Sequence, residues 1–100
     1  MDLFNSLPLK KQEYMNRLFR NCTVHLVRKY EQKIPAPEIL VLNQTRARIS
    51  EEVGISIKTL DRNIRKLEEM NLLTLNKGKI VITKAQYLQM KQDIDFYVNG

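Results

Sequence analysis

The sequence has few of the residues that mark linkers, disulfide frameworks or metal sites. Three Gly and three Pro in 100 residues are too few for a linker or a low-complexity segment. Cys22 is the only cysteine, which excludes an intramolecular disulfide. Together with His25, it could supply at most two of the four ligands that a structural zinc site uses. We therefore expect a packed thiol, a partly exposed imidazole, and neither a metal site nor a cofactor.

Long apolar runs are also absent. No run approaches the ~20 residues that span a membrane, and Met1 to Asn5 lack the basic stretch and apolar core of a secretion signal. We expect a soluble, cytoplasmic protein that makes no membrane contact. Its 100 residues are the size of one domain, and a hydrophobic content of 43% is enough for one modest core.

Positive charge is abundant and unevenly spread. The net charge of +6 favours a polyanionic partner. Residues 1–34 hold seven Lys and Arg against three acids, and residues 57–84 hold the same numbers. Residues 35–56 are nearly balanced, and residues 85–100 are slightly acidic. Basic blocks alone are weak evidence because many are only solvated faces, so the structural setting of the second block decides its meaning.

A long helix is predicted over residues 10–33, after a lead-in of residues 1–9. Its apolar residues recur every three or four positions, as on a helix with one buried face. They are Met15, Leu18, Phe19, Cys22, Leu26, Val27 and Tyr30. Pro35 and Pro37 prevent its continuation, because residues before proline are pushed out of the helical region. The apolar run 39–42 then predicts a short strand.

Two shorter helices with a tight turn between them are predicted over residues 45–70. Thr45 opens the first, and Gly54 ends it because glycine takes a left-handed conformation at little cost. Ser56 can cap the second, which runs to about residue 70. Its buried positions are Leu60, Ile64 and Leu67. Helices joined by so short a turn cross steeply, which leaves the second one protruding.

Residues 72–82 predict a β-hairpin, since two β-prone runs flank the Gly-containing turn 76–79. Thr83 can cap a last helix, 83–98, in which Tyr87, Met90, Ile94 and Val98 share a face. The order of elements predicts a mainly α protein with a small β component. We expect one domain, 1–100, with a winged helix-turn-helix fold: a three-helix core, a hairpin wing and an extra C-terminal helix.

The protruding helix carries a basic stripe. Lys58, Arg62 and Arg65 are spaced by four and three residues, on the face opposite the buried positions. Lys58 and Arg62 repel each other, and Asp61, four residues before Arg65, partly offsets that repulsion. A protruding helix of this kind fits the major groove of B-DNA. Next to a basic hairpin turn, the stripe indicates DNA binding rather than a merely solvated face.

The chain resembles the C-terminal DNA-binding domain of the Crp/Fnr family of bacterial transcription regulators in the run TRARISEEVGISIKTLDRNIRKLEEMNLL, followed by NKGKIVIT. The resemblance covers about residues 12–83. The matching positions are Thr45, Ile49, Ser50, Val53 to Ser56, Thr59, Leu60, Arg62, Lys66, Leu67, Asn71, Leu72, Gly78 and Ile80 to Ile82. The resemblance implies a winged helix that binds double-stranded DNA sequence-specifically, as part of a transcription regulator.

The resemblance also implies roles for single positions. Ile57, Lys58 and Arg62 match those that read base edges, with helix 56–70 in the major groove. Arg62 alone keeps the family's usual type and is expected to make a bidentate contact with guanine. Ile57 and Lys58 replace a customary Arg and Glu, which puts the usual operator in doubt, although Ile57 can touch a thymine methyl. Contacts to phosphate, with the wing 76–79 on the backbone, are expected from Thr45, Arg46, Ser56, Thr59, Arg65, Lys66, Lys77 and Lys79.

Two departures from the family pattern concern packing. Glu52 and Asn63 stand where apolar residues are usual, which indicates either looser packing or a contact with a partner. The apolar stripes of residues 14–30 and 87–98 motivate the hypothesis of a homodimer, if one domain does not bury them fully. The family's effector-sensing domain and RNA polymerase are further expected partners. The chain is then either an excised C-terminal domain or a short regulator with its own dimer contacts.

Three alternatives to this function predict different sequence features. A winged helix that binds protein would carry a neutral or apolar recognition face, and this face is basic apart from Ile57. A small phage or plasmid regulator outside Crp/Fnr is favoured by the chain length, whereas the order of strands and helices favours Crp/Fnr. We expect no enzyme and assign no catalytic residue, because no carboxylate pair, phosphate-binding glycine loop, or nucleophile with His and Asp is present.

Overall fold

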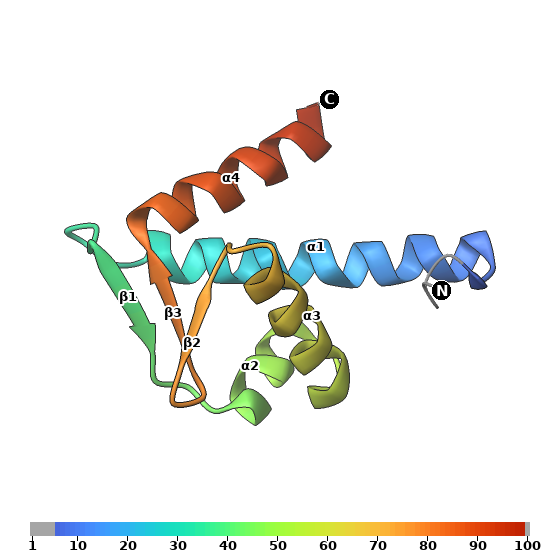
Figure 1. Ribbon diagram of the computed structural model, residues 1–100, viewed down its shortest axis with the longest axis horizontal. Helices are drawn as coiled ribbons and strands as arrows, with labels where there is room; N and C mark the ends of the chain where they lie inside the picture. The colour runs from blue at the N-terminus through green and yellow to red at the C-terminus, as the bar shows by residue number, and fades with distance from the viewer. Residues whose placement is uncertain (1–5, 100) are drawn as a thin grey trace.

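The structure is a computed structural model that describes residues 6–99, the last four of them in backbone only (Figure 1). Its elements are α1 (Leu9–Glu31), β1 (Ile39–Leu42), α2 (Arg46–Val53), α3 (Ile57–Glu69), β2 (Thr74–Asn76), β3 (Lys79–Thr83) and α4 (Lys84–Asn99). This part of the chain is mainly helical with a small three-stranded antiparallel sheet, compatible with an α+β fold. No helix within it is both long and apolar enough to cross a membrane. Residues 1–5 of the expected lead-in lie outside the described residues.

The long first helix is confirmed with slightly shifted ends. α1 begins after Pro8 rather than at residue 10 and ends at Glu31 rather than at residue 33. The amide of Gln32, which caps it, donates to the carbonyl of Arg28 at 3.0 Å. The buried part of the apolar stripe lies in the C-terminal half of the helix, at Cys22, Leu26, Val27 and Tyr30. The N-terminal half extends beyond α2 and α3 (Figure 1).

The sheet has the order β1-β3-β2, with β3 in the middle. β1 pairs with β3 in the antiparallel register that places Ile39 opposite Thr83 and Leu42 opposite Ile80. The predicted strand over 39–42 is therefore confirmed. Leu40 and Leu42 face the core, whereas Ile39 and Val41 face outward, as the two-residue period of a strand requires.

The predicted hairpin is confirmed, but its first strand starts at Thr74 rather than at residue 72. Leu72 and Leu73 are buried in the turn that leaves α3, where the amide of Leu72 donates to the carbonyl of Leu67 at 2.9 Å. The two strands are joined by Lys77 and Gly78, whose φ angles are 53° and 80°. Two positive φ values in a two-residue loop give the backbone twist that antiparallel strands favour.

Both predicted caps around the tight turn are confirmed. Thr45 Oγ1 accepts from the amide of Arg48 at 3.1 Å, and Ser56 Oγ accepts from the amide of Thr59 at the same distance. Gly54 takes φ of +83°, a left-handed conformation that ends α2 and lets α3 start three residues later. The side chains of α3 that enter the core include the three predicted ones, Leu60, Ile64 and Leu67.

α4 packs along α1. The rings of Tyr30 and Tyr87 stack with centroids 4.2 Å apart, and Met90 is fully buried. Thr83 caps α4 as predicted: its Oγ1 accepts from the amide of Gln86, whose side chain accepts from the amide of Thr83. The buried members of the two apolar stripes thus pack against each other within one chain. A homodimer through the exposed parts of these stripes is not tested by this packing and stays a prediction. The side chain of Val98 lies outside the described residues.

Candidate nucleic-acid interface

The outward face of α3 is cationic and exposed. Lys58, Arg62 and Arg65 are exposed, and they fall within an arc of about 60° at 100° per residue, directly opposite the buried face of the helix. Within residues 6–99, none of these three side chains forms a hydrogen bond or an ion pair. Their charges are therefore available to an external anion.

Ile57 lies at the start of α3 with 46% of its surface exposed. It is the first residue of the helix, one position before Lys58, so it flanks the cationic stripe at its N-terminal end. A helix N-terminus also presents unpaired amides, which attract anions. An exposed aliphatic group in this position can contact a methyl group of a ligand without obstructing the cations.

The hydroxyls that were predicted to contact phosphate also form hydrogen bonds within the chain. Thr45 and Ser56 cap α2 and α3, and Ser56 Oγ also donates to Thr59 Oγ1 at 3.0 Å. These hydroxyls lie at the first turns of the two helices, where amides still lack partners. Thr45 Oγ1 and Thr59 Oγ1 act only as acceptors in these bonds, which leaves their hydroxyl hydrogens for a further acceptor.

Arg46 joins three elements of the candidate interface. Its Nη2 donates to the carbonyl of Gly78 at 2.6 Å, and its Nε lies 3.4 Å from a carboxylate oxygen of Asp61. One guanidinium therefore ties the start of α2 to the middle of α3 and to the turn between β2 and β3. Arg46 was predicted as a phosphate contact, and the structure adds a tethering role that no spacing in the sequence indicates.

The partner of Asp61 differs from the one expected from the sequence. Asp61 was expected to interact with Arg65, four residues later on the same helix, but the ion pair that forms is with Arg46. Asp61 lies off the cationic stripe, on the flank of α3 that faces the hairpin turn. The stripe therefore keeps its full positive charge.

The remaining cations with predicted phosphate roles lie in different settings. Lys77, in the turn, is exposed and makes no hydrogen bond or ion pair within residues 6–99. Lys79 Nζ donates at 3.1 Å to Oδ1 of Asn43, the residue that follows β1. Lys66 lies over the ring of Phe19 in α1, with Nζ 4.4 Å from the centroid. Lys77 thus resembles the α3 stripe in being uncommitted, whereas Lys66 and Lys79 support packing.

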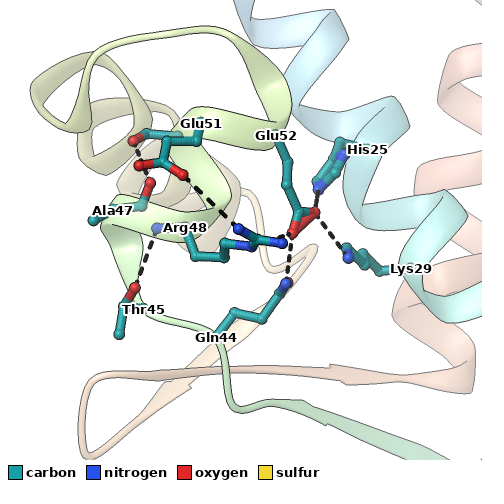
Figure 2. A network of polar contacts seen from close by, with 9 residues as sticks. His25, Lys29, Gln44, Thr45, Ala47, Arg48, Glu51 and Glu52 are labelled. Atoms are coloured by element: carbon teal, nitrogen blue, oxygen red, sulfur yellow. Dashed lines mark hydrogen bonds and ion pairs between the residues drawn. The ribbon is translucent and has the colours of Figure 1, made fainter.

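Glu52 forms a polar cluster between α1 and α2 (Figure 2). Its carboxylate lies 2.8 Å from Lys29 Nζ and 3.2 Å from His25 Nε2, and it accepts from Gln44 Nε2 at 2.6 Å. Arg48 approaches it from the preceding turn of α2, at 3.6 Å. The sequence indicated looser packing or an external contact at Glu52, and the structure corrects this: the partners lie within the chain, and the cluster links α2 to α1.

Two pKa values in the cluster move in the same direction. The hydrogen bonds from Lys29 and Gln44 lower the pKa of Glu52 below its ordinary value. Partial burial lowers the pKa of His25, against the opposing charge of Glu52, so the neutral imidazole is favoured. The side chain of His25 keeps 20% of its surface exposed, as the sequence predicted. The cluster is thus built around one carboxylate and the cations of Lys29 and Arg48.

Asn63 has a different environment from Glu52. It lies on the inner face of α3 with only 5% of its surface exposed, and its Nδ2 is buried without a hydrogen-bond partner among the described residues. A buried amide that lacks a partner destabilises the fold. The sequence indicated looser packing or an external contact here too, and an unsatisfied amide inside the domain fits the first of these.

Neither the protein-family models, nor the curated proteins, nor the solved structures contain a match to this chain. The resemblance to Crp/Fnr therefore depends on the motif residues themselves.

The other chemistry-bearing side chains of the described residues include the only cysteine. Cys22 is fully buried in the core, as predicted, and burial raises the pKa of its thiol to about 12. Among residues 6–99, no three His, Cys, Asp or Glu side chains are placed to hold one metal ion. A recess of about 760 Å³ lies between α1, the end of α3 and α4, away from the outward stripe of α3.

Proposed function

We propose that this chain is a winged helix domain that binds double-stranded DNA sequence-specifically, as part of a bacterial transcription regulator of the Crp/Fnr type. In this proposal α3 enters the major groove, and the turn at Lys77 and Gly78 is the tip of the wing. The single observation that carries the proposal is the exposed and unpaired row of Lys58, Arg62 and Arg65 along α3.

The arrangement of the neighbouring elements supports this proposal. α3 starts after a three-residue connection from α2, with the hairpin immediately after it in the chain. Arg46 holds the hairpin turn against the flank of α3, at Gly78 and Asp61. A helix in the major groove and a tethered turn beside it would contact bases and the adjacent backbone together.

The proposed roles divide the side chains by what they reach. Arg62, in the centre of the stripe, would donate two hydrogen bonds to a guanine, a contact worth about 1–3 kcal/mol of discrimination. Lys58 and Ile57, one turn earlier, would contact the neighbouring base edges. Arg65 and Lys77 would contact phosphates, which carry no sequence information directly.

Salt dependence gives a quantitative expectation. Each phosphate neutralised by Lys or Arg releases a counterion. The logarithm of the binding constant therefore falls linearly with the logarithm of the salt concentration, with a slope of about 0.9 per phosphate. For about four phosphates, raising the salt concentration from about 50 to about 200 mM should weaken binding on the order of a hundredfold. A neutral protein-binding face would show no such dependence on salt.

The experiment begins with selection of bound duplexes from a random pool, followed by fluorescence anisotropy with a selected duplex and a scrambled one. Arg62→Ala should reduce the preference for the selected duplex, whereas Lys77→Ala should weaken binding to both equally. Arg28→Ala, which removes an exposed arginine on α1, is the matched control and should leave both affinities unchanged. Affinity that is indifferent to salt, or equal behaviour of the Arg62 and Lys77 variants, contradicts the proposal.

A further inference from the structure

The outer edge of the sheet is formed by β1. The strand order β1-β3-β2 leaves β1 paired on one side only, and no other element of residues 6–99 lies beyond it (Figure 1). Edge strands are usually protected by charge, proline or a bulge, because their free backbone groups accept another strand. The residues of β1, Ile39, Leu40, Val41 and Leu42, include no charge and no proline.

The direction of the backbone groups follows from the register. The amide of Lys84 donates to the carbonyl of Glu38, so these two residues form a hydrogen-bonded pair. Because hydrogen-bonded and non-hydrogen-bonded pairs alternate in an antiparallel ladder, Leu40 and Leu42 direct their N–H and C=O groups toward β3. Ile39 and Val41 therefore direct theirs toward the open edge. Their side chains are 59% and 44% exposed on the outer face of the sheet.

A groove accompanies this edge. It has a volume of about 570 Å³ and lies between the last turn of α1 and the chain from Leu40 to Gln44. Its other wall is formed by Lys29, in the last turn of α1, and by Gln32 and Lys33, which follow that helix. Lys29 is paired with Glu52, whereas Lys33 is exposed and its side chain has no ion pair within the described residues.

From these observations we propose that the occupant of this edge is the β1 strand of a second copy of the chain. The two strands pair antiparallel about a two-fold axis, with Ile39 of each opposite Val41 of the other and the two Leu40 residues on the axis. This register satisfies the free backbone groups of Ile39 and Val41 in hydrogen-bonded pairs. It also keeps the buried face of both sheets on the same side, because the side-chain period of a strand is two.

Charge complementarity selects this occupant. The same register places Glu38 of the second copy opposite Leu42, beside the groove that Lys33 lines. Glu38 shares the inward side of Leu40 and Leu42, which is the side on which α1 packs. Within residues 6–99, Glu38 has no ion pair of its own. The two-fold axis therefore creates two equivalent contacts between Glu38 and Lys33, one in each direction.

The interface predicted in this way is small. Two four-residue strands bury less than the roughly 800 Å² per partner of a standard stable complex, so we expect a weak dimer that forms only at high protein concentration. The inference does not depend on the proposed function.

Sedimentation equilibrium of the full chain without DNA tests the proposal. The average mass should rise from one chain toward two as the concentration increases from about 5 to about 500 µM. Val41→Pro removes an outward N–H without breaking a bond to β3, and it should keep the mass at one chain throughout. Met70→Lys is the matched control on a distant surface: Met70 is 49% exposed at the end of α3, and its replacement should leave the dimer intact.

A charge exchange keeps the test independent of any folding defect in the proline variant. Glu38→Lys and Lys33→Glu should each weaken association about threefold to tenfold, and the double variant should restore it. Circular dichroism confirms that each variant is folded. A chain that stays monomeric at about 500 µM overturns the proposal. So does a dimer that Met70→Lys disrupts and Val41→Pro does not, since the two copies would then meet through the α1, α3 and α4 recess.

Discussion

Replacement of Asn63 by leucine should stabilise the protein, although it alters a helix next to the proposed DNA contacts. Asn63 is 5% exposed, and its Nδ2 has no partner among the described residues. It lies on the inner face of α3 between Leu60 and Leu67, which are both fully buried. Leucine has the same branched arrangement of side-chain heavy atoms and no polar atom, so it suits this environment, although its methyl groups are bulkier than the amide oxygen and nitrogen.

The magnitude follows from two opposing contributions. An unpaired buried donor costs about 1–3 kcal/mol, and removal of the amide recovers that cost. A branched side chain in a packed site adds some strain, which offsets part of the gain. We expect the free energy of unfolding to rise by about 1–2 kcal/mol. For a chain of this size the melting temperature should then rise by about 4–8 °C for each kcal/mol.

Urea unfolding followed by circular dichroism at 222 nm measures this change. Asn21→Leu is the matched control, because Asn21 is exposed in the middle of α1 and gains the same helix propensity without any burial. The control should change stability by less than about 0.5 kcal/mol. Equal gains in the two variants, or a loss of stability for Asn63→Leu, would refute the inference that the Asn63 amide is unsatisfied.

Three further outcomes are expected. Arg46→Ala should leave the chain folded but speed hydrogen exchange at the Lys77–Gly78 turn, measured by NMR, and should cost only about 0.5–1 kcal/mol because the Arg46 side chain is partly exposed. Stability should fall as the pH drops from about 7 to about 5. The folded pKa of His25 lies below its unfolded value of about 6.5, so the unfolded chain takes up the proton first. In a series of urea unfolding curves at different pH values, His25→Gln should flatten the dependence in this region. The thiol of Cys22, with its pKa raised to about 12, should react with a disulfide reagent at pH 8 only as fast as the chain unfolds, and a reaction at the rate of a free thiol would contradict its burial.

Local signals in the sequence predicted most of the elements. Thr45, Gly54 and Ser56 each act within a few residues of themselves, and all three appear in the predicted roles. The 3.6-residue period of the apolar residues predicted the buried face of α3, and with it the exposed stripe on the opposite side. Such features depend on neighbours along the chain, which is the information that a single sequence contains.

Contacts between distant segments could not be predicted in the same way. Asp61 was assigned to Arg65 by spacing on one helix, but Arg46 reaches it from α2 and Gly78 from the hairpin turn completes the bridge. Glu52 was recognised as unusual, whereas Lys29 and His25, which surround it, come from a helix more than twenty residues earlier. The first hairpin strand was placed two residues early because Leu72 and Leu73 are β-prone yet enter the core.

The junction at Thr83 has a mechanical consequence. Thr83 is both the last residue of β3 and the cap of α4, and Gln86 closes the junction from the helix side, so no loop separates strand from helix. α4 therefore leaves the sheet with its direction already set by β3, and the stack of Tyr87 on Tyr30 and the bond from Lys91 to Glu31 fix it again on α1. A shift of β3 relative to α1 would have to break these contacts before α4 could follow it.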